Sequence, residues 1–108
     1  MTTLYIAGPM TGLEDYNYPA FNAAAAQLRD VGYEVLNPTL DRETPSEDPP
    51  SMTWVDYLRA SIVMVAKADG IALLPGWQDS KGARLEVHIA DQLGYTLAPV
   101  NQWVEDAA

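Results

Sequence analysis

The 108 residues suffice for one packed domain and include no cysteine, which excludes disulfides, thiol catalysis and thiolate metal sites. Hydrophobic residues make up 48% and charged residues 19%, the balance of a globular rather than a disordered chain. The net charge of −9 argues against a nucleic-acid polymer as partner, because phosphate backbones are bound by clustered Lys and Arg.

Membrane insertion and export are not expected either. No apolar run approaches the roughly 20 residues of a membrane span, and the first residues lack the basic region and cleavage site of a secretory signal. A single histidine also excludes a histidine-based metal cluster. We therefore expect one cytoplasmic domain over residues 1–108, without a cofactor or metal, whose acidic surplus keeps it soluble.

The first third of the chain predicts a strand and then a helix. Residues 4–7 are an apolar run typical of a buried strand, which Gly8-Pro9 ends. After a loop at residues 14–19, the alanine-rich pattern of residues 20–30 predicts an amphipathic helix. Gly32 is a typical stop for that helix.

The middle of the chain predicts a second strand, a loop and a second helix. The strand covers residues 33–36, and the loop at 39–51 holds four acidic side chains and three prolines. Thr53 and Asp56 fit a capping box that opens a helix running to Ala66. The apolar face predicted for this helix consists of Val55, Leu58, Ile62 and Val65.

The last third predicts a strand at residues 70–74, a helix at 82–93 stopped by Gly94, and a strand at 95–100, with Trp103 sealing a sheet edge. Strands that alternate with helices predict a right-handed parallel α/β sheet. In such sheets ligands bind beyond the carboxyl ends of the strands. The segments expected at that edge are 8–12, Asn37, the helix start at Thr53, and 76–82.

Glu86 is the strongest candidate for chemistry. It lies about one turn inside the last predicted helix, where a carboxylate facing inward is costly without a role. An ion pair with Arg84 or Lys81 is the structural alternative, but neither has the three- or four-residue spacing that helical pairs favour. We therefore favour a functional role. The small or apolar residues on its face are Gly82, Ala83, Ile89, Ala90 and Leu93.

Other candidates have two interpretations each. Ser80 either caps the helix or binds a ligand oxygen, and the two weigh equally. Trp77 either stacks on a flat base or packs as a lid over the core. The turn at residues 8–12 lacks the glycine fingerprints of dinucleotide and phosphate loops, so by itself it favours a structural turn.

Two motifs lie at opposite ends of the chain, Tyr5-Ile6-Ala7-Gly8-Pro9 and Ser80-x-Gly82-x-x-x-Glu86. In these motifs the chain resembles the nucleoside 2-deoxyribosyltransferase superfamily. In the longer patterns Asn17-Tyr18-Pro19-Ala20-Phe21 and Leu74-Pro75-Gly76-Trp77 it is similar to the small DUF4406 branch. The resemblance covers most of the chain.

The resemblance implies a Rossmann-like or flavodoxin-like three-layer fold with four or five parallel strands, in a homo-oligomer (a dimer or larger). It implies a nucleoside or nucleotide substrate and Glu86 as the nucleophile on the anomeric carbon, as in retaining glycosidases. It also matches Ser80 to a serine that contacts a 5′-phosphate. Our candidate substrate-binding residues are Tyr5, Gly8, Pro9, Thr11, Trp77, Ser80 and Gly82.

The chain departs from the family pattern at two positions. Ser61 stands where family enzymes carry an aspartate that helps to protonate the reacting groups, and a serine is no general acid near neutral pH. Asp56 or Asp79 is a candidate substitute, so we include both in the catalytic set. Thr11 replaces an arginine of the nucleotide hydrolases.

Three functions follow as hypotheses. The first is an enzyme of the N-glycosidic bond, a deoxyribosyl transferase or a hydrolase, that uses Glu86. The second is a nucleotide-binding or regulatory module without catalysis, which Ser61 favours. The third is a small interaction protein that uses the acidic loop at residues 39–51, although an active-site lid fits that loop equally.

Overall fold

The computed structural model describes residues 1–43 and 53–107. They form a four-stranded parallel sheet between helices, which confirms the α/β class and the expected Rossmann-like or flavodoxin-like architecture. The strands are β1 (Thr3–Ala7), β2 (Glu34–Leu36), β3 (Gly70–Leu73) and β4 (Thr96–Pro99), in the order β2-β1-β3-β4. The helices are α1 (Tyr18–Asp30), α2 (Trp54–Lys67), α3 (Lys81–Gln92) and α4 (Val100–Ala107), with 3₁₀ helices at Glu14–Asn17 and Trp77–Asp79.

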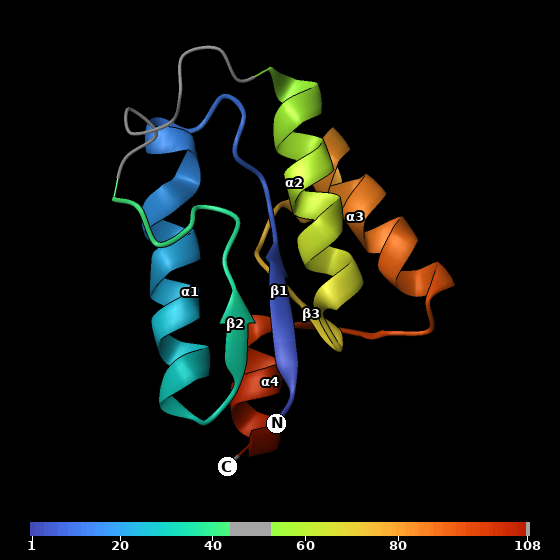
Figure 1. The fold of residues 1–108 in the computed structure, drawn as a ribbon. Coiled ribbons are helices and arrows are strands. Elements are labelled where there is room, and N and C mark those ends of the chain that lie inside the picture. The colour runs from blue at the N-terminus through green and yellow to red at the C-terminus, as the bar shows by residue number, and fades with distance from the viewer. Residues whose placement is uncertain (44–52, 108) are drawn as a thin grey trace.

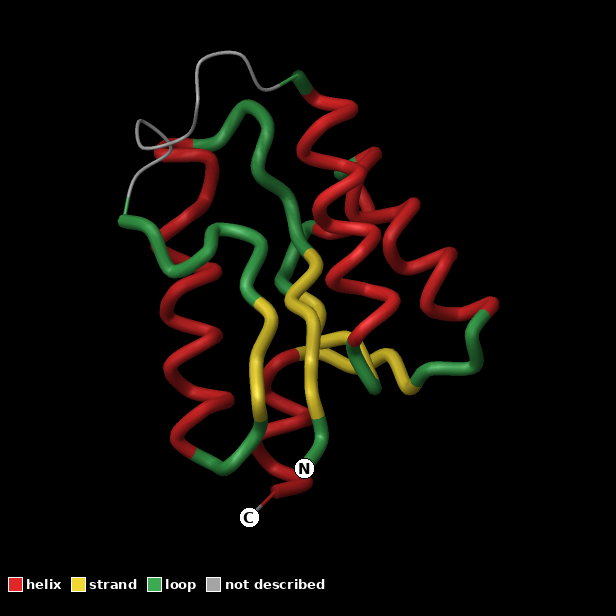
Figure 2. The backbone as a smooth tube through the Cα atoms, viewed as in Figure 1, coloured by secondary structure: helices red, strands yellow, loops and turns green. Residues whose placement is uncertain are grey.

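Helices cover both faces of the sheet. α1 and α4 pack on one face, and α2 and α3 pack on the other (Figure 1, Figure 2). Successive side chains of a strand point to opposite faces, so Leu4 and Ile6 join the core under α1 and α4, while Tyr5 and Ala7 join the core under α2 and α3. This double burial explains why β1 is a continuous apolar run.

The strand order creates a switch point between β1 and β3. The chain runs from β1 through α1 to β2 on one side, and from β3 through α3 to β4 on the other. The segments that leave the carboxyl ends of β1 and β3 therefore diverge, and such a divergence is where open α/β sheets bind ligands.

The C-terminal helix α4 differs from the prediction. The fourth strand ends at Pro99, and Val100 begins a helix rather than closing the strand. Trp103 lies on this helix, donates from Nε1 to the Ile71 carbonyl oxygen at 2.8 Å and contacts Gly70. The expectation that Trp103 seals a sheet edge is therefore wrong, because Ile71 belongs to the inner strand β3.

Two other local predictions also need correction. The expected loop at residues 14–19 contains a 3₁₀ helix and the first turn of α1, where Pro19 has the fixed φ that a helix start accepts. Val55 was expected on the buried face of α2 but is 49% exposed. The inward face of α2 instead carries Ser61 and Val65, one turn apart.

The acidic loop is only partly visible, because residues 44–52 lie outside the described part of the chain. Its start is anchored by Thr39, which is buried and donates from Oγ1 to Asn22 Oδ1 at 2.8 Å. Asn37 donates to the same Asn22 oxygen at 2.9 Å. This arrangement holds the end of β2 against α1.

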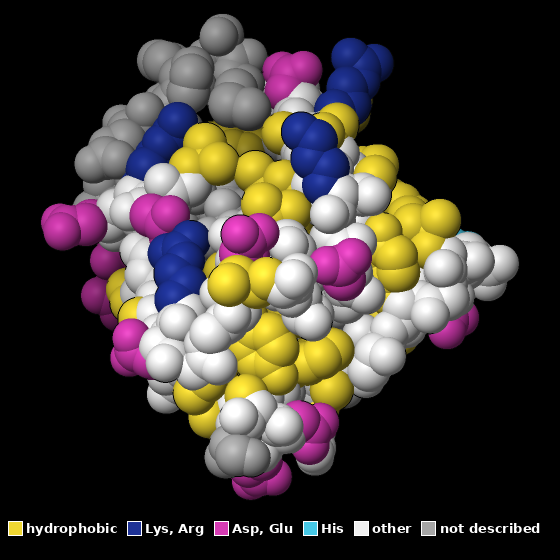
Figure 3. Space-filling view, turned by 60° about the horizontal axis from the view of Figure 1, so that its bottom comes forward, with side chains coloured by type: hydrophobic (Ala, Val, Ile, Leu, Met, Phe, Trp, Pro, Cys, Tyr) yellow, Lys and Arg dark blue, Asp and Glu magenta, His cyan; other side chains and the backbone are white. Residues whose placement is uncertain are grey.

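On one face of the molecule the acidic side chains are dispersed (Figure 3). Figure 3 shows Asp and Glu scattered among neutral and hydrophobic groups on the face seen from below. Within residues 1–43 and 53–107, no helix is both long and apolar enough to cross a bilayer.

Gly8→Ala is expected to lower the free energy of unfolding by about 1–3 kcal/mol, the usual cost of overpacking. A Cβ at this position would lie 2.7 Å from Leu74 Cβ, in a contact that has no room for it. Urea denaturation measures the change. Gly82→Ala is the control, because its Cβ would meet nothing within 4 Å and helix propensity favours alanine by up to about 1 kcal/mol. Equal stabilities of the two variants would contradict the packing argument.

Candidate functional site

The centre of the site is the carboxyl group of Glu86. It lies in the second turn of α3, only 7% exposed, and Oε2 accepts a hydrogen bond of 2.7 Å from the Tyr5 hydroxyl. Tyr5 itself is 1% exposed. The two residues stand 81 positions apart in the chain, so only the packing of α3 over β1 brings them together.

Hydrogen-bonded caps set where α2 and α3 begin, and so set the positions of Ser61 and Glu86 along these helices. The Ser80 hydroxyl caps α3 by accepting from the Ala83 backbone N–H at 3.2 Å, and Glu86 follows on the inward face. Thr53 and Asp56 close a capping box that starts α2, as predicted. With α2 beginning there, Ser61 is buried on the side of α2 that faces the core shared with Tyr5 and Glu86.

Ser61 completes a three-residue polar cluster, which we call the Glu86 cluster: Tyr5, Ser61 and Glu86. Its hydroxyl donates to the Leu58 carbonyl oxygen at 3.0 Å, and it lies close enough to the other two members to act on their pKa values by hydrogen bonding. Ser61 therefore lies beside Glu86 in this cluster.

Burial dominates the electrostatics of the Glu86 cluster. Burial raises the pKa of Glu86 above its usual value, and hydrogen bonds from Tyr5 and Ser61 offset part of this rise. Burial, reinforced by the neighbouring Glu86 charge, raises the pKa of Tyr5 well above its usual value, so the phenol stays a neutral donor. The one ion pair among the described residues joins Arg29 and Asp41, so no described cation neutralises Glu86.

The two proposed substitute acids lie apart from the Glu86 cluster. Asp56 is exposed at the start of α2, where its Oδ2 accepts from the Thr53 backbone N–H at 3.0 Å. Asp79 is exposed in the 3₁₀ helix that precedes α3. The structure therefore places neither carboxylate beside Tyr5 or Ser61.

The other candidate residues on the turn between β3 and α3 differ in their burial and backbone conformation. Trp77 is half-buried and packs against the core under α2 and α3, as the lid interpretation expects. Gly76 has φ of +84°, a left-handed conformation that favours glycine at this turn. Gly82 has open space around it, so a ligand can approach its backbone.

The β1 turn is mainly structural. Gly8 is buried against Leu74, and the Pro9 carbonyl oxygen accepts from Asn17 Nδ2 at 3.0 Å. Thr11 is exposed. Asn17 ends three consecutive residues with left-handed φ angles, a rare backbone arrangement that fixes the loop before α1.

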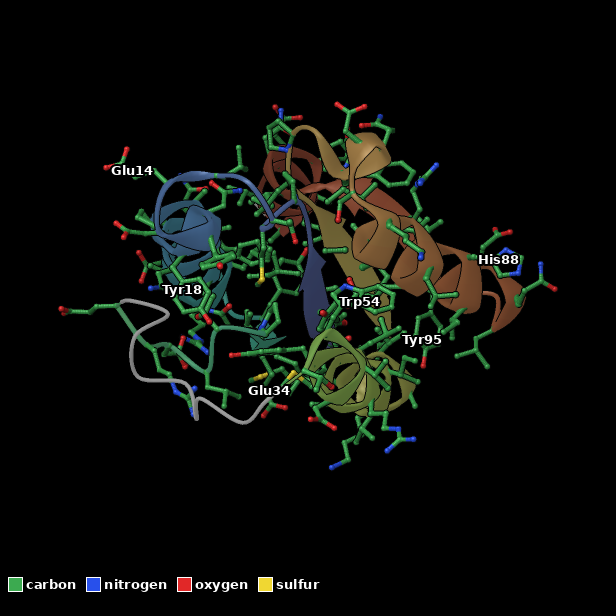
Figure 4. All side chains as sticks on the ribbon, turned by 90° about the horizontal axis from the view of Figure 1, so that it is seen from above. Glu14, Tyr18, Glu34, Trp54, His88 and Tyr95 are labelled. Carbon is green, nitrogen blue, oxygen red and sulfur yellow. The ribbon has the colours of Figure 1, made fainter. Side chains whose placement is uncertain are left out.

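His88 and Asp69 lie away from the Glu86 cluster. His88 is on the outer side of α3 and points away from the molecule (Figure 4). Asp69 accepts from the Thr3 backbone N–H at 2.9 Å, at the amino ends of the strands.

The sequence did not predict a cation–π contact between Lys81 and Trp54. Lys81 Nζ lies 5.0 Å from the centroid of the Trp54 ring, so the first residues of α2 and α3 meet. In the view from above, Figure 4 shows Trp54 between these two helices. The available signal was the spacing, since Trp54 and Ser61 lie two helical turns apart on one side of α2.

Chemically, the Glu86 cluster offers a buried carboxylate that accepts a hydrogen bond from the neutral Tyr5 hydroxyl. Such a group can act as a nucleophile or a base once it is ionised. No group of three or more metal-binding side chains occurs within residues 1–43 and 53–107.

Glu86→Gln is expected to make stability less sensitive to rising pH. Because the folded pKa of Glu86 is raised, its favourable contribution is complete below the unfolded pKa and is lost as pH rises through the folded pKa. Glutamine keeps the size and the acceptor for Tyr5 but does not ionise. Urea titrations from about pH 4 to about pH 8 should show a larger loss for the wild type. Parallel losses would contradict the raised pKa.

Comparison with protein-family models gives a match that spans most of the chain. The model of the family described as "Domain of unknown function (DUF4406)" matches residues 2–98, which include every member of the Glu86 cluster. No curated protein matches the chain. Because the match spans most of the sequence, the chain belongs to the DUF4406 family.

Proposed function

We propose that the protein acts on the N-glycosidic bond of a nucleoside or nucleotide, as a deoxyribosyl transferase or a hydrolase, with Glu86 as the nucleophile. The observation that carries this proposal is the buried carboxyl group of Glu86, held by the Tyr5 hydroxyl without a described cation. A buried carboxylate of this kind is expensive to maintain for stability alone. Perturbed carboxyl groups of this kind are concentrated at active sites.

The resemblance to nucleoside 2-deoxyribosyltransferases supports the choice of reaction. In that reaction a carboxylate oxygen attacks the anomeric carbon, the new C–O bond forms, and the bond to the base nitrogen breaks with its electron pair leaving on the base. Tyr5 holds Oε2, so Oε1 is the oxygen that we assign to the attack. The departing base takes a proton from solvent.

Hydrolysis and transfer differ only in the second step. Water or a second base attacks the glycosyl-enzyme on the same carbon, and the Glu86 carboxylate leaves with its electron pair. We also propose a homo-oligomer, because the resembling family completes its sites with a neighbouring subunit.

Incubation with a panel of deoxynucleosides and their 5′-monophosphates tests the proposal. Free base, separated by chromatography, is the expected product of the wild type. If the wild type releases no more base than Glu86→Ala does, the catalytic proposal is wrong.

A nucleotide-binding module is the second candidate. It is favoured by Ser61, which stands beside Glu86 where an acid would be needed, and by the distant positions of Asp56 and Asp79. Saturable nucleotide binding without turnover would select this alternative. Absence of any nucleotide binding would exclude both functions.

A further inference from the structure

We propose that Trp54 and Lys81 form a recognition pair that selects an anionic ligand at the amino ends of α2 and α3, the helices that carry Ser61 and Glu86. The inference rests on the proposed function and names its substrate class as nucleoside 5′-monophosphates rather than free nucleosides.

The pair lies at the amino ends of the two helices that carry Ser61 and Glu86. Trp54 opens α2, two turns before Ser61 on the same side of the helix, and Lys81 opens α3, five residues before Glu86. The two helices that carry Ser61 and Glu86 are therefore joined at their first residues by the Trp54–Lys81 contact. The first residues of both helices lie on the side of the sheet where the strands end, because α2 follows β2 and α3 follows β3, and open α/β sheets bind ligands at that edge.

Trp54 is suited to bind a ring. Its side chain is 47% exposed, which is large for an indole beside a core. A flat aromatic face binds bases by stacking without regard to their identity. We therefore assign Trp54 to general affinity and not to the choice between charged and neutral ligands.

Lys81 supplies the selectivity for charge. A chain with a net charge of −9 repels an anionic ligand, so a local cation is needed where the anion binds. The only ion pair within the described residues is Arg29–Asp41, so no described carboxylate neutralises Lys81. The ammonium over the Trp54 ring keeps N–H donors for phosphate oxygens.

Lys81→Gln is the decisive variant. Calorimetry should show about tenfold weaker binding of a deoxynucleoside 5′-monophosphate and less than about twofold change for the same deoxynucleoside. Where turnover is found, the KM of the monophosphate should rise about as much as its affinity falls, and the KM of the nucleoside should change little. Lys81→Arg should retain the preference, since it retains the cation. Trp54→Ala should weaken the binding of both ligands about tenfold, and Trp54→Phe should weaken it less.

Lys67→Gln is the matched control, because it removes one positive charge from the exposed far end of α2. Circular dichroism checks that each variant is folded. Lys81-dependent binding of the monophosphate without base release would support the recognition pair and refute the catalytic proposal. Three results would overturn the recognition pair: equal affinity of the wild type for both ligands, an effect of Lys67→Gln on binding as large as that of Lys81→Gln, or no binding of either ligand. Base release that does not depend on Lys81 would also overturn the recognition pair, but it would leave the catalytic proposal standing.

Discussion

Glu86→Ala is expected to lower base release from the best deoxynucleoside or deoxynucleotide by at least about 10³-fold, because it removes the atom that forms the covalent intermediate. The loss should fall on kcat, since the proposed mechanism uses Glu86 in the chemical step rather than in general affinity. Chromatographic rates and KM values, measured together, separate the two effects.

Chemical rescue makes this prediction sharper. Alanine leaves a space beside Tyr5 that a small carboxylate such as formate can enter, and formate should restore part of the rate to Glu86→Ala but not to Glu86→Gln. Asp91→Asn is the control, because it removes an exposed carboxylate from the same helix. A loss of rate in Asp91→Asn equal to that in Glu86→Ala would show that the effect is general and not local to the Glu86 cluster.

Ser61→Asp is expected to raise the rate of base release by about 10²-fold, the lower range for general acid catalysis. The structure places Ser61 beside Glu86 and Tyr5, so an aspartate there would put two carboxyl groups at close range. Like charges so close favour one shared proton, and the protonated partner can donate to the leaving base. The pH–rate profile should become bell-shaped.

The controls for this variant are isosteric. Ser61→Asn has the same shape as the aspartate variant but cannot donate an acid proton, so it should show no gain. If Ser61→Asp is folded by circular dichroism and yet no faster than the wild type, Ser61 does not stand at the position of the acid. A gain in both variants would indicate an effect of size rather than of proton transfer.

Much of the fold could be predicted because its causes are local. The apolar run of β1, the Thr53–Asp56 capping box and the stop at Gly94 each depend on neighbouring residues, and all three occur as expected. The short helix α4 was missed because Val100 continues an apolar strand pattern, and only the contacts of Trp103 with β3 reveal the helix as part of the core.

The site shows the same division. The sequence by itself indicated Glu86, because a carboxylate among small and apolar residues on a helix face is visible from spacing alone. It also raised Ser61 as a departure but gave no means to choose among Ser61, Asp56 and Asp79 as its partner.

Only the tertiary structure decided that choice. Tyr5 meets Glu86 across 81 positions, and Ser61 joins them because α2 and α3 pack side by side over β1, whereas Asp56 is held outside by its own helix cap. Such contacts form because two helices are buried against one sheet, which brings residues distant in the sequence together. No local sequence pattern encodes them. The sequence therefore determined the α/β class and the carboxylate, and the packing determined its partners.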